Sequence, residues 1–523
     1  MIKKITNTIL LFLSILSLFI CCRQVKKTYK EKPLNILIAI SDDQAFSFTS
    51  FSGCRFINTP GFDRVAKNGV FFVNCFAGSP GCAPSRSSLV TGRHHWQNEQ
   101  SGQHASSWMK KYIPMVDMFT KAGYYAGATG KGVGPFRYAK SEEDSLFRKT
   151  NAAGEIDNSI KYSKDNDPRT GSGISKENYY ANFLTFMNHR KKEQPFFFWY
   201  GAHEPHRDYE KDSWKKMGKS LDSVDVPGFL PDNATVRGDM LDFAVEVEWF
   251  DSHLVRMLNY LDNIGELDNT IVIVTGDNGI PFPRAKANCF EYGTHVPLAI
   301  SCPKIIPGGR IVKDPTGFVD LSPTLFELTG VSFSGMLPIS GKSIAQTLKS
   351  HKSGIVNPNK KYVFAGRERH SCSRWKNLGY PQRAVRSMQY LYIWNMCPER
   401  WPAGAPHELN NKELAFKDID SSPSKDYLLA HHTEKEIKPY YELAVDKRPE
   451  FELYDIEKDP YCLQNLIEKT EFKEVAVEMK NILVKELKRS KDPRLGDNPG
   501  IFDTYKRYSV MRKFSEPDYS AKK

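Results

Sequence analysis

Runs of mostly apolar residues recur along the first 300 positions of the chain, and each run ends in polar or glycine residues. They cover residues 34–40, 124–129, 196–200, 270–275 and 296–301. Their apolar positions do not alternate with polar ones, which predicts strands buried on both faces. Residues 239–264 instead have apolar positions at helical spacing. Strands and helices in alternation predict an α/β fold with a large, mostly parallel sheet flanked by helices.

The pattern changes after about residue 350. Residues 350–361 are polar and contain proline and glycine, which is typical of a linker. Short strands at 362–366 and 390–394 and a late helix at 474–487 follow it. We therefore expect a large domain over residues 34–355 and a smaller α+β domain over residues 356–523.

The N-terminus has the pattern of an export signal. Lys3 and Lys4 precede an apolar run at residues 9–20, which is too short to span a bilayer. Cys21 and Cys22 end the run, and a basic segment follows, so the region resembles a bacterial lipoprotein signal. This predicts a signal peptide over 1–22, a tether over 23–33, a lipid anchor at either cysteine, and an exported periplasmic or outer-membrane lipoprotein. A plain signal peptide is the alternative.

Net charge argues against a nucleic-acid-binding protein, and cysteine spacing argues against a disulfide-built or zinc-binding one. The formal net charge is +12, but the basic excess lies mostly in residues 1–32 and 505–523. The body is therefore nearly neutral, and we expect no nucleic-acid partner. The other eight cysteines show neither a disulfide framework nor paired zinc-ligand spacing.

Polar residues follow four of the predicted strands at the point where each strand ends. They are Asp42-Asp43, Gly130-Lys131, His203 and Asp277-Asn278. The carboxyl ends of parallel strands meet at one edge of a sheet, where ligands of α/β proteins bind. Oxygen donors without a thiolate suit a hard cation, Ca²⁺ or Mg²⁺.

Cys82 belongs to the stretch GCAPSRSSLVTGR. Pro84 suits the first turn of a helix and Gly92 suits its end. Position 82 then lies at a helix N-terminus, which favours negative charge, with Arg86 one turn along. A thiolate would be activated there, yet a hard cation prefers oxygen. We therefore expect position 82 to present oxygen rather than sulfur.

The stretch from Cys82 to Arg93 resembles the signature C-x-P-S-R-x-x-x-x-T-G-R of type I sulfatases. The segments ISDDQ, GATGKG, GAHEPH, TGDNG and FELYDIEKDP accompany it in order. The resemblance covers nearly the whole mature chain and implies an alkaline-phosphatase-like sulfatase fold. It also implies that a formylglycine-forming maturation enzyme oxidises Cys82 to formylglycine, whose hydrate is the nucleophile.

The resemblance assigns roles position by position. One Ca²⁺ per chain would be held by Asp42, Asp43, Asp277, Asn278 and the oxygen at position 82. Arg86 would hold the formylglycine hydrate, Lys131 and Lys286 would bind sulfate oxygens, and His203 would protonate the leaving group. The histidine that often follows the lysine motif in this family is missing after Lys131. His94, His95 or His104 is a candidate replacement.

Further segments, including GRERH and GYPQRAVR, resemble bacterial proteins similar to heparan N-sulfatase (sulfamidase). This implies hydrolysis of an N-sulfoglucosamine in glycosaminoglycan degradation. The candidate substrate-binding residues are His104, His206, Arg207, Glu368, Arg369, His370 and Arg383, several of which could equally form structural ion pairs.

Three alternatives remain at this point. The first is an exo-O-sulfatase of another glycosaminoglycan or an algal polysaccharide. The second is a phosphatase or phosphodiesterase of the same superfamily, disfavoured by the Cys-x-Pro-Ser-Arg motif and the all-oxygen donor set. The third is a non-catalytic glycan-binding lipoprotein.

Overall fold

The predicted strands lie side by side in an eight-stranded sheet. β1 (Asn35–Ser41) pairs in parallel with β6 (Phe196–Gly201) on one side and with β7 (Thr270–Gly276) on the other. β4 (Tyr125–Gly130) continues the parallel pairing beyond β6. Every residue of β1, β6 and β7 is buried, as expected for strands covered on both faces. β8 (Leu298–Ser301) runs antiparallel to both of its neighbours.

The strand order is β5-β4-β6-β1-β7-β8-β2-β9. The strands not yet described are β5 (Ile156–Asn158), β2 (Val70–Phe72) and β9 (Arg310–Val312), and a separate pair of short strands is β3 (Cys75–Phe76) with β10 (Thr316–Gly317). The computed structural model describes residues 32–140, 144–406 and 414–517. The predicted signal peptide and the lipid anchor at Cys21 or Cys22 lie outside the described residues.

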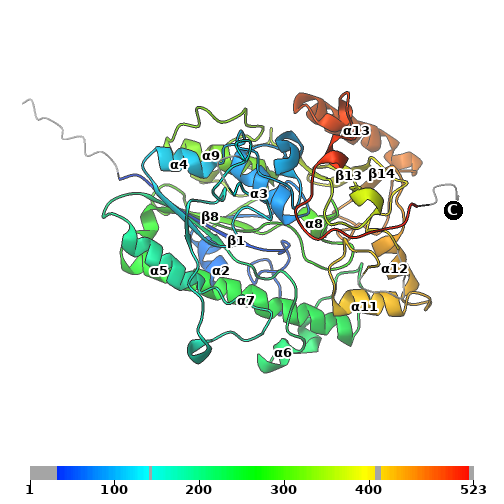
Figure 1. Ribbon diagram of the computed structural model, residues 1–523, viewed down its shortest axis with the longest axis horizontal. Coiled ribbons are helices and arrows are strands. Elements are labelled where there is room, and N and C mark those ends of the chain that lie inside the picture. Colours follow the sequence, from blue (N-terminus) through cyan, green and yellow to red (C-terminus); the bar gives the residue numbers. More distant parts are fainter. Residues whose placement is uncertain (1–31, 141–143, 407–413, 518–523) are drawn as a thin grey trace, which may run out of the picture. The chain divides into compact units, whose positions relative to one another are not determined.

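Helices pack on both faces of this sheet (Figure 1). One face carries α2 (Pro60–Lys67), α5 (Tyr179–His189) and α7 (Ala234–Asn263), and the other carries α3 (Cys82–Thr91), α4 (Met115–Lys121) and α9 (Leu321–Thr329). Leu37 of β1 joins the core on the α7 side, whereas Ile36 and Ile38 join the core on the α3 side. This alternation follows from the two-residue period of a strand. Helix α7 begins earlier than residue 239 because Asn233 caps it, accepting hydrogen bonds from two backbone amides.

A second sheet lies in the C-terminal part of the chain. It is antiparallel, with strands β11 (Val363–Arg367), β12 (Gln382–Arg386), β13 (Tyr390–Asn395) and β14 (Phe451–Asp455) in that order. Its helices and the short helices of the first part are α6 (Ser213–Lys216), α8 (Glu291–Thr294), α10 (Ala345–Lys349), α11 (Pro423–Ala430), α12 (Lys438–Val445), α13 (Lys473–Arg489) and α14 (Ile501–Thr504). The expected α/β architecture with a smaller C-terminal sheet is confirmed, while the domain boundary at residue 356 stays a prediction.

The described residues contain neither a membrane-spanning helix nor a disulfide. No helix among them has both the length and the apolar character that crossing a bilayer would need. The eight described cysteines are all free, and Cys82 is one of the buried ones.

Candidate active site

The carboxyl ends of β1, β4, β6 and β7 bring the predicted polar residues together. The Asp43 backbone amide donates to Asp277 Oδ1 at 2.9 Å, and Asn278 Nδ2 donates to Asp43 Oδ1 at 2.8 Å. These contacts join residues more than 230 positions apart in the sequence. The sheet topology therefore assembles the cluster, as expected for parallel strands that end at one edge.

This cluster fits a hard cation. Carboxylate oxygens of Asp42, Asp43 and Asp277 lie within 4.8 Å of one another, and all three residues are buried. Among the described residues, Asp42 Oδ1 and Asn278 Oδ1 are buried without a hydrogen-bond partner, which is costly unless another group satisfies them. Burial and the Asp42 carboxylate raise the pKa of Asp277. A cation bound to these oxygens would relieve both costs, and hard oxygen donors suit Ca²⁺ or Mg²⁺.

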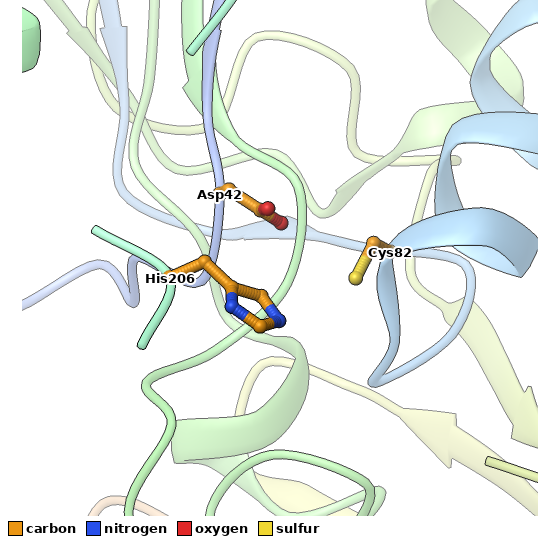
Figure 2. Close-up of side chains that lie close together, drawn as sticks. All are labelled: Asp42, Cys82 and His206. Carbon is orange, nitrogen blue, oxygen red and sulfur yellow. The ribbon is translucent and has the colours of Figure 1, made fainter. Parts of the chain in front are cut away.

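Cys82 is the first residue of α3, as the sequence predicted. Gly81 precedes it in extended conformation, and Gly92 ends the helix with a left-handed φ of 65°. Burial raises the pKa of the Cys82 thiol to about 12, so the unmodified side chain is a poor thiolate nucleophile. The side chains of Asp42, Cys82 and His206 point toward one another (Figure 2), with ligand atoms within 4.8 Å. Position 82 therefore faces the acidic cluster.

Arg86 joins α3 to two strand ends. Its side chain is fully buried, and Nε donates to Asp277 Oδ2 at 2.7 Å. Nη1 donates to the carbonyl oxygens of Lys131 and Gly132 at 2.9 and 3.0 Å. Nη2 has no hydrogen-bond partner in the described chain and lies 3.8 Å from Asp42 Oδ1. Arg86 therefore holds the cluster together and retains one donor beside it.

Both predicted sulfate-binding lysines contact the acidic cluster. Lys131 Nζ pairs with Asp42, and Lys286 Nζ donates to Asp43 Oδ2 at 2.6 Å. Lys286 Nζ also donates to Asp420 Oδ2 at 3.0 Å. Asp420 comes from the C-terminal part of the chain and was not predicted as a site residue. It lies in the segment DIDSSPSK, far from Lys286 in sequence, so no spacing pattern could connect the two.

A cavity of about 480 Å³ opens beside Cys82, within the usual range for small-molecule sites. Its walls are formed by Asp42, Cys82, His104, Lys131, Gly134, Pro135, Gly173, His203, Glu204, His206, Arg207 and Glu246. Burial, followed by the Lys131 cation, lowers the pKa of His203 to about 4. An anion bound to Lys131 would offset the second effect. Glu204 and Glu246 were not predicted from the sequence.

Of the three histidines proposed as replacements, His104 is the one that lines this cavity. It is partly buried, and its Nδ1 atom is buried without a partner among the described residues. His94 Nε2 lies 2.9 Å from Glu486 Oε1, and His95 Nδ1 lies 3.2 Å from the Gly102 carbonyl oxygen. Neither His94 nor His95 lines the cavity.

His206 and Arg207 differ in how free their side chains are. His206 is partly exposed, with Nε2 3.9 Å from Asp43 Oδ2. Arg207 lines the cavity, but Nη1 and Nη2 donate to Asp239 at 2.7 and 2.8 Å and Nε donates to the Pro281 carbonyl oxygen at 2.8 Å. The Arg207 charge is therefore largely neutralised by Asp239.

Glu368 and Arg383 lie outside the walls of this cavity, in a buried ion network. Arg383 Nη2 donates to Glu368 Oε1 at 2.7 Å, and Arg383 Nε donates to Asp492 Oδ2 at 2.5 Å. Arg494 Nη2 donates to Glu368 Oε2 at 2.5 Å. The two guanidinium groups outweigh burial and lower the pKa of Glu368 to about 2. These contacts indicate that Glu368 and Arg383 form structural ion pairs, and a role of either residue in substrate binding stays an untested prediction.

Arg369 and His370 lie near the cavity but do not form its walls. Arg369 Nη2 donates to Ser106 Oγ at 3.0 Å. The His370 ring lies 5.0 Å from the His104 ring between centroids. His370 is therefore a neighbour of His104, and contact of Arg369 or His370 with substrate stays a prediction.

Comparison with known proteins identifies the family. The sulfatase family model matches residues 34–331, more than half of the chain. The human N-sulphoglucosamine sulphohydrolase is 26% identical, over 91% of this chain and 94% of its own length. An ulvan-active sulfatase of Formosa agariphila is 25% identical, over 92% of this chain and 81% of its own length.

A solved structure of a complex with the substrate D-glucosamine-2-N,6-O-disulfate matches with a TM-score of 0.60 and 20% identity, over 88% of this chain and 99% of that one. This likeness shows the fold, which is the expected alkaline-phosphatase-like one. With its sheet-edge acidic cluster and Cys82 at the start of α3, the chain belongs to the sulfatase family and is a hydrolase of that family.

Proposed function

We propose that this sulfatase removes sulfate from the nitrogen of an N-sulfoglucosamine during glycosaminoglycan degradation. The observation that carries the sulfatase chemistry is the placement of Cys82 at the start of α3, facing Asp42 and opening into a cavity. The choice of an N-sulfated sugar is supported by the likeness to the human N-sulphoglucosamine sulphohydrolase, which extends over nearly both chains.

The proposed cofactors are one Ca²⁺ and a formylglycine made from Cys82 by a maturation enzyme. Asp42, Asp43, Asp277 and Asn278 would hold the cation together with the oxygen at position 82. The hydrated aldehyde supplies a nucleophilic oxygen and a second hydroxyl for release of sulfate, and the cation stabilises negative charge there. The buried oxygens without partners support this assignment.

The residues of the chain then have distinct tasks. Lys131 and Lys286 neutralise the sulfate oxygens, where negative charge is greatest during transfer. His203 delivers a proton to the leaving nitrogen. In the overall reaction the N–S bond is broken, water supplies the new S–O bond, and sulfate and a protonated amine leave.

An exo-acting O-sulfatase is the second candidate. The likeness to the ulvan-active sulfatase of Formosa agariphila supports it, because it extends over 92% of this chain. The cavity of about 480 Å³ beside Cys82 suits exo-action on small saccharides for either candidate. We also propose that the protein is exported and anchored through Cys21 or Cys22, based on the N-terminal sequence.

Sulfate release tests the proposal. The protein is co-expressed with a formylglycine-forming enzyme, supplied with Ca²⁺ and given glucosamine N-sulfate or 6-O-sulfo-N-acetylglucosamine, with Cys82→Ala as control. Release from the N-sulfated sugar alone is the expected result. Release from the O-sulfated sugar alone would replace the proposal by the second candidate. If formylglycine is absent from the matured protein, a non-catalytic glycan-binding role is favoured.

A further inference from the structure

The cavity wall contains two buried carboxyl groups that the proposed chemistry does not use. Glu204 follows β6 and is 1% exposed, and Glu246 lies on α7 and is 3% exposed. The charged groups that act most strongly on Glu246 are Glu204 and Arg207, not the lysines beside Cys82. This part of the cavity is therefore acidic, in contrast to the part that faces Lys131.

Glu204 has its hydrogen bonds satisfied within the protein. Its Oε1 accepts from the Ser175 backbone amide at 2.7 Å, and its Oε2 accepts from the Tyr179 hydroxyl at 2.8 Å. The same hydroxyl accepts from the His203 backbone amide at 3.1 Å. Glu204 is therefore a positioning residue, acting through Tyr179 on the segment that carries His203.

Glu246 is different, because its Oε2 is buried and has no hydrogen-bond partner among the described residues. A buried acceptor without a partner is destabilising, and more so when it is charged. Burial, followed by the Glu204 carboxylate, holds the pKa of Glu246 well above its usual range. A ligand that donates a hydrogen bond to Glu246 would remove this cost and stabilise its ionised form.

The surroundings of Glu246 suit a neutral donor better than a second anion. Arg207 is the cation of the wall that acts on Glu246, and its three nitrogens are already bound to Asp239 and the Pro281 carbonyl oxygen. Gly173 packs against this carboxyl group: a Cβ added there would lie 2.8 Å from Glu246 Oε1 and 2.2 Å from the Asp208 carbonyl oxygen, so only a glycine fits at this point of the wall. A sugar hydroxyl can donate to the Glu246 carboxyl group, whereas a sulfate group has only acceptor oxygens and would find the Arg207 cation already bound.

We propose that Glu246 determines saccharide specificity by accepting a hydrogen bond from a hydroxyl of the sugar that carries the scissile sulfate. By the same contact it disfavours a sugar with a second sulfate in this part of the cavity. Specificity then combines an attractive contact for one ligand with repulsion of its competitor. The inference rests on the proposed function, since it assumes that a sulfated saccharide occupies the cavity.

The test compares wild type with Glu246→Gln on glucosamine N-sulfate and glucosamine N,6-O-disulfate. A hydrogen bond to a charged group is worth about 1.5–3 kcal/mol, so kcat/KM for the singly sulfated sugar should fall roughly 10- to 100-fold. The wild-type preference for that sugar should also shrink. Glu248→Gln is the matched control, because Glu248 lies on the same helix but binds Lys219 and the Asn58 amide outside the cavity.

Two results would overturn the role of Glu246. One is a Glu246→Gln variant whose kcat/KM values stay within about twofold of wild type, and the other is a wild-type preference for the disulfated sugar. Failure of the proposed function looks different: wild type then hydrolyses 6-O-sulfo-N-acetylglucosamine but no N-sulfated sugar. In that case the variant is measured on the O-sulfated sugar, where a similar loss supports the role and an unchanged value overturns it.

Discussion

Arg383→Met should destabilise the protein without removing a substrate contact. Arg383 is fully buried, and its guanidinium group donates to Asp492 at 2.5 and 3.1 Å and to Glu368 at 2.7 Å. Methionine is unbranched and apolar and ends where the guanidinium group of Arg383 begins, so the main change is the loss of the positive charge and its hydrogen bonds. Glu368 keeps its ion pair with Arg494, whereas Asp492 loses this partner.

The expected cost follows from this arrangement. Removing one partner of a buried ion pair costs about 3–5 kcal/mol, because the other charge is left buried and uncompensated. Since Glu368 remains paired, we expect a value near the lower end, about 3 kcal/mol. Arg383 also lies 5.1 Å from the centre of the buried Trp96 ring, and loss of this desolvated cation–π contact adds about 2 kcal/mol.

Equilibrium urea denaturation of wild type and Arg383→Met measures this change in the free energy of unfolding. Arg55→Met is the control, because Arg55 pairs with Asp225 at 2.5 Å but both side chains are more than 60% exposed. Its cost should be about 0–1 kcal/mol. An Arg383→Met variant as stable as wild type, with KM raised tenfold, would refute the structural reading and restore Arg383 as a substrate-binding residue.

Three further predictions concern pH, positioning and the metal. Burial raises the pKa of Glu291, but the Arg386 cation and the other groups around it lower this pKa from 4.5 to about 2. The ionised Glu291 carboxylate therefore stabilises the folded state fully above pH 4.5, and this stabilisation is lost as the pH falls toward 2. Urea midpoints should therefore fall over this range in wild type and change less in Glu291→Gln; parallel profiles would contradict the assignment. Tyr179→Phe removes the hydroxyl between His203 and Glu204, and a kcat roughly tenfold lower at unchanged KM is expected; a change in KM alone would argue against positioning. EDTA should lower the melting temperature of wild type, because a bound cation stabilises the folded state, but not that of Asp277→Asn; equal shifts in both would argue against this site.

The sequence was informative wherever local chemistry decided the structure. The runs at 34–40, 196–200 and 270–275 lack polar positions because both faces of their strands are covered, and this pattern is visible without a structure. The helix beginning at Cys82 was also predictable, because Pro84 favours the first turn of a helix and Gly92 favours its end, and both effects act on the residue's own backbone.

Residues brought in by distant parts of the chain could not be found in this way. Asp420 binds Lys286, which lies 134 residues away in the sequence. Glu246 lies on α7 and lines the cavity, but the apolar spacing of this helix indicated only that one face is buried, not that Glu246 faces a cavity. Sequence similarity suggested Glu368 and Arg383 as substrate-binding residues. Their burial in an ion network is visible only when Asp492 and Arg494 are brought beside them.

By itself, the sequence determined the buried strands, the acidic and basic residues at their ends, and the family signature around Cys82. Backbone propensity and hydrophobic period act over a few residues, so the elements they specify can be recognised in a short stretch of sequence. Only the tertiary structure decided which carboxylates remain without partners and which cations are already neutralised, as Arg207 is by Asp239. Charge compensation depends on distances between side chains from separate elements, and a buried charge is stabilised or left costly by neighbours that the sequence does not place.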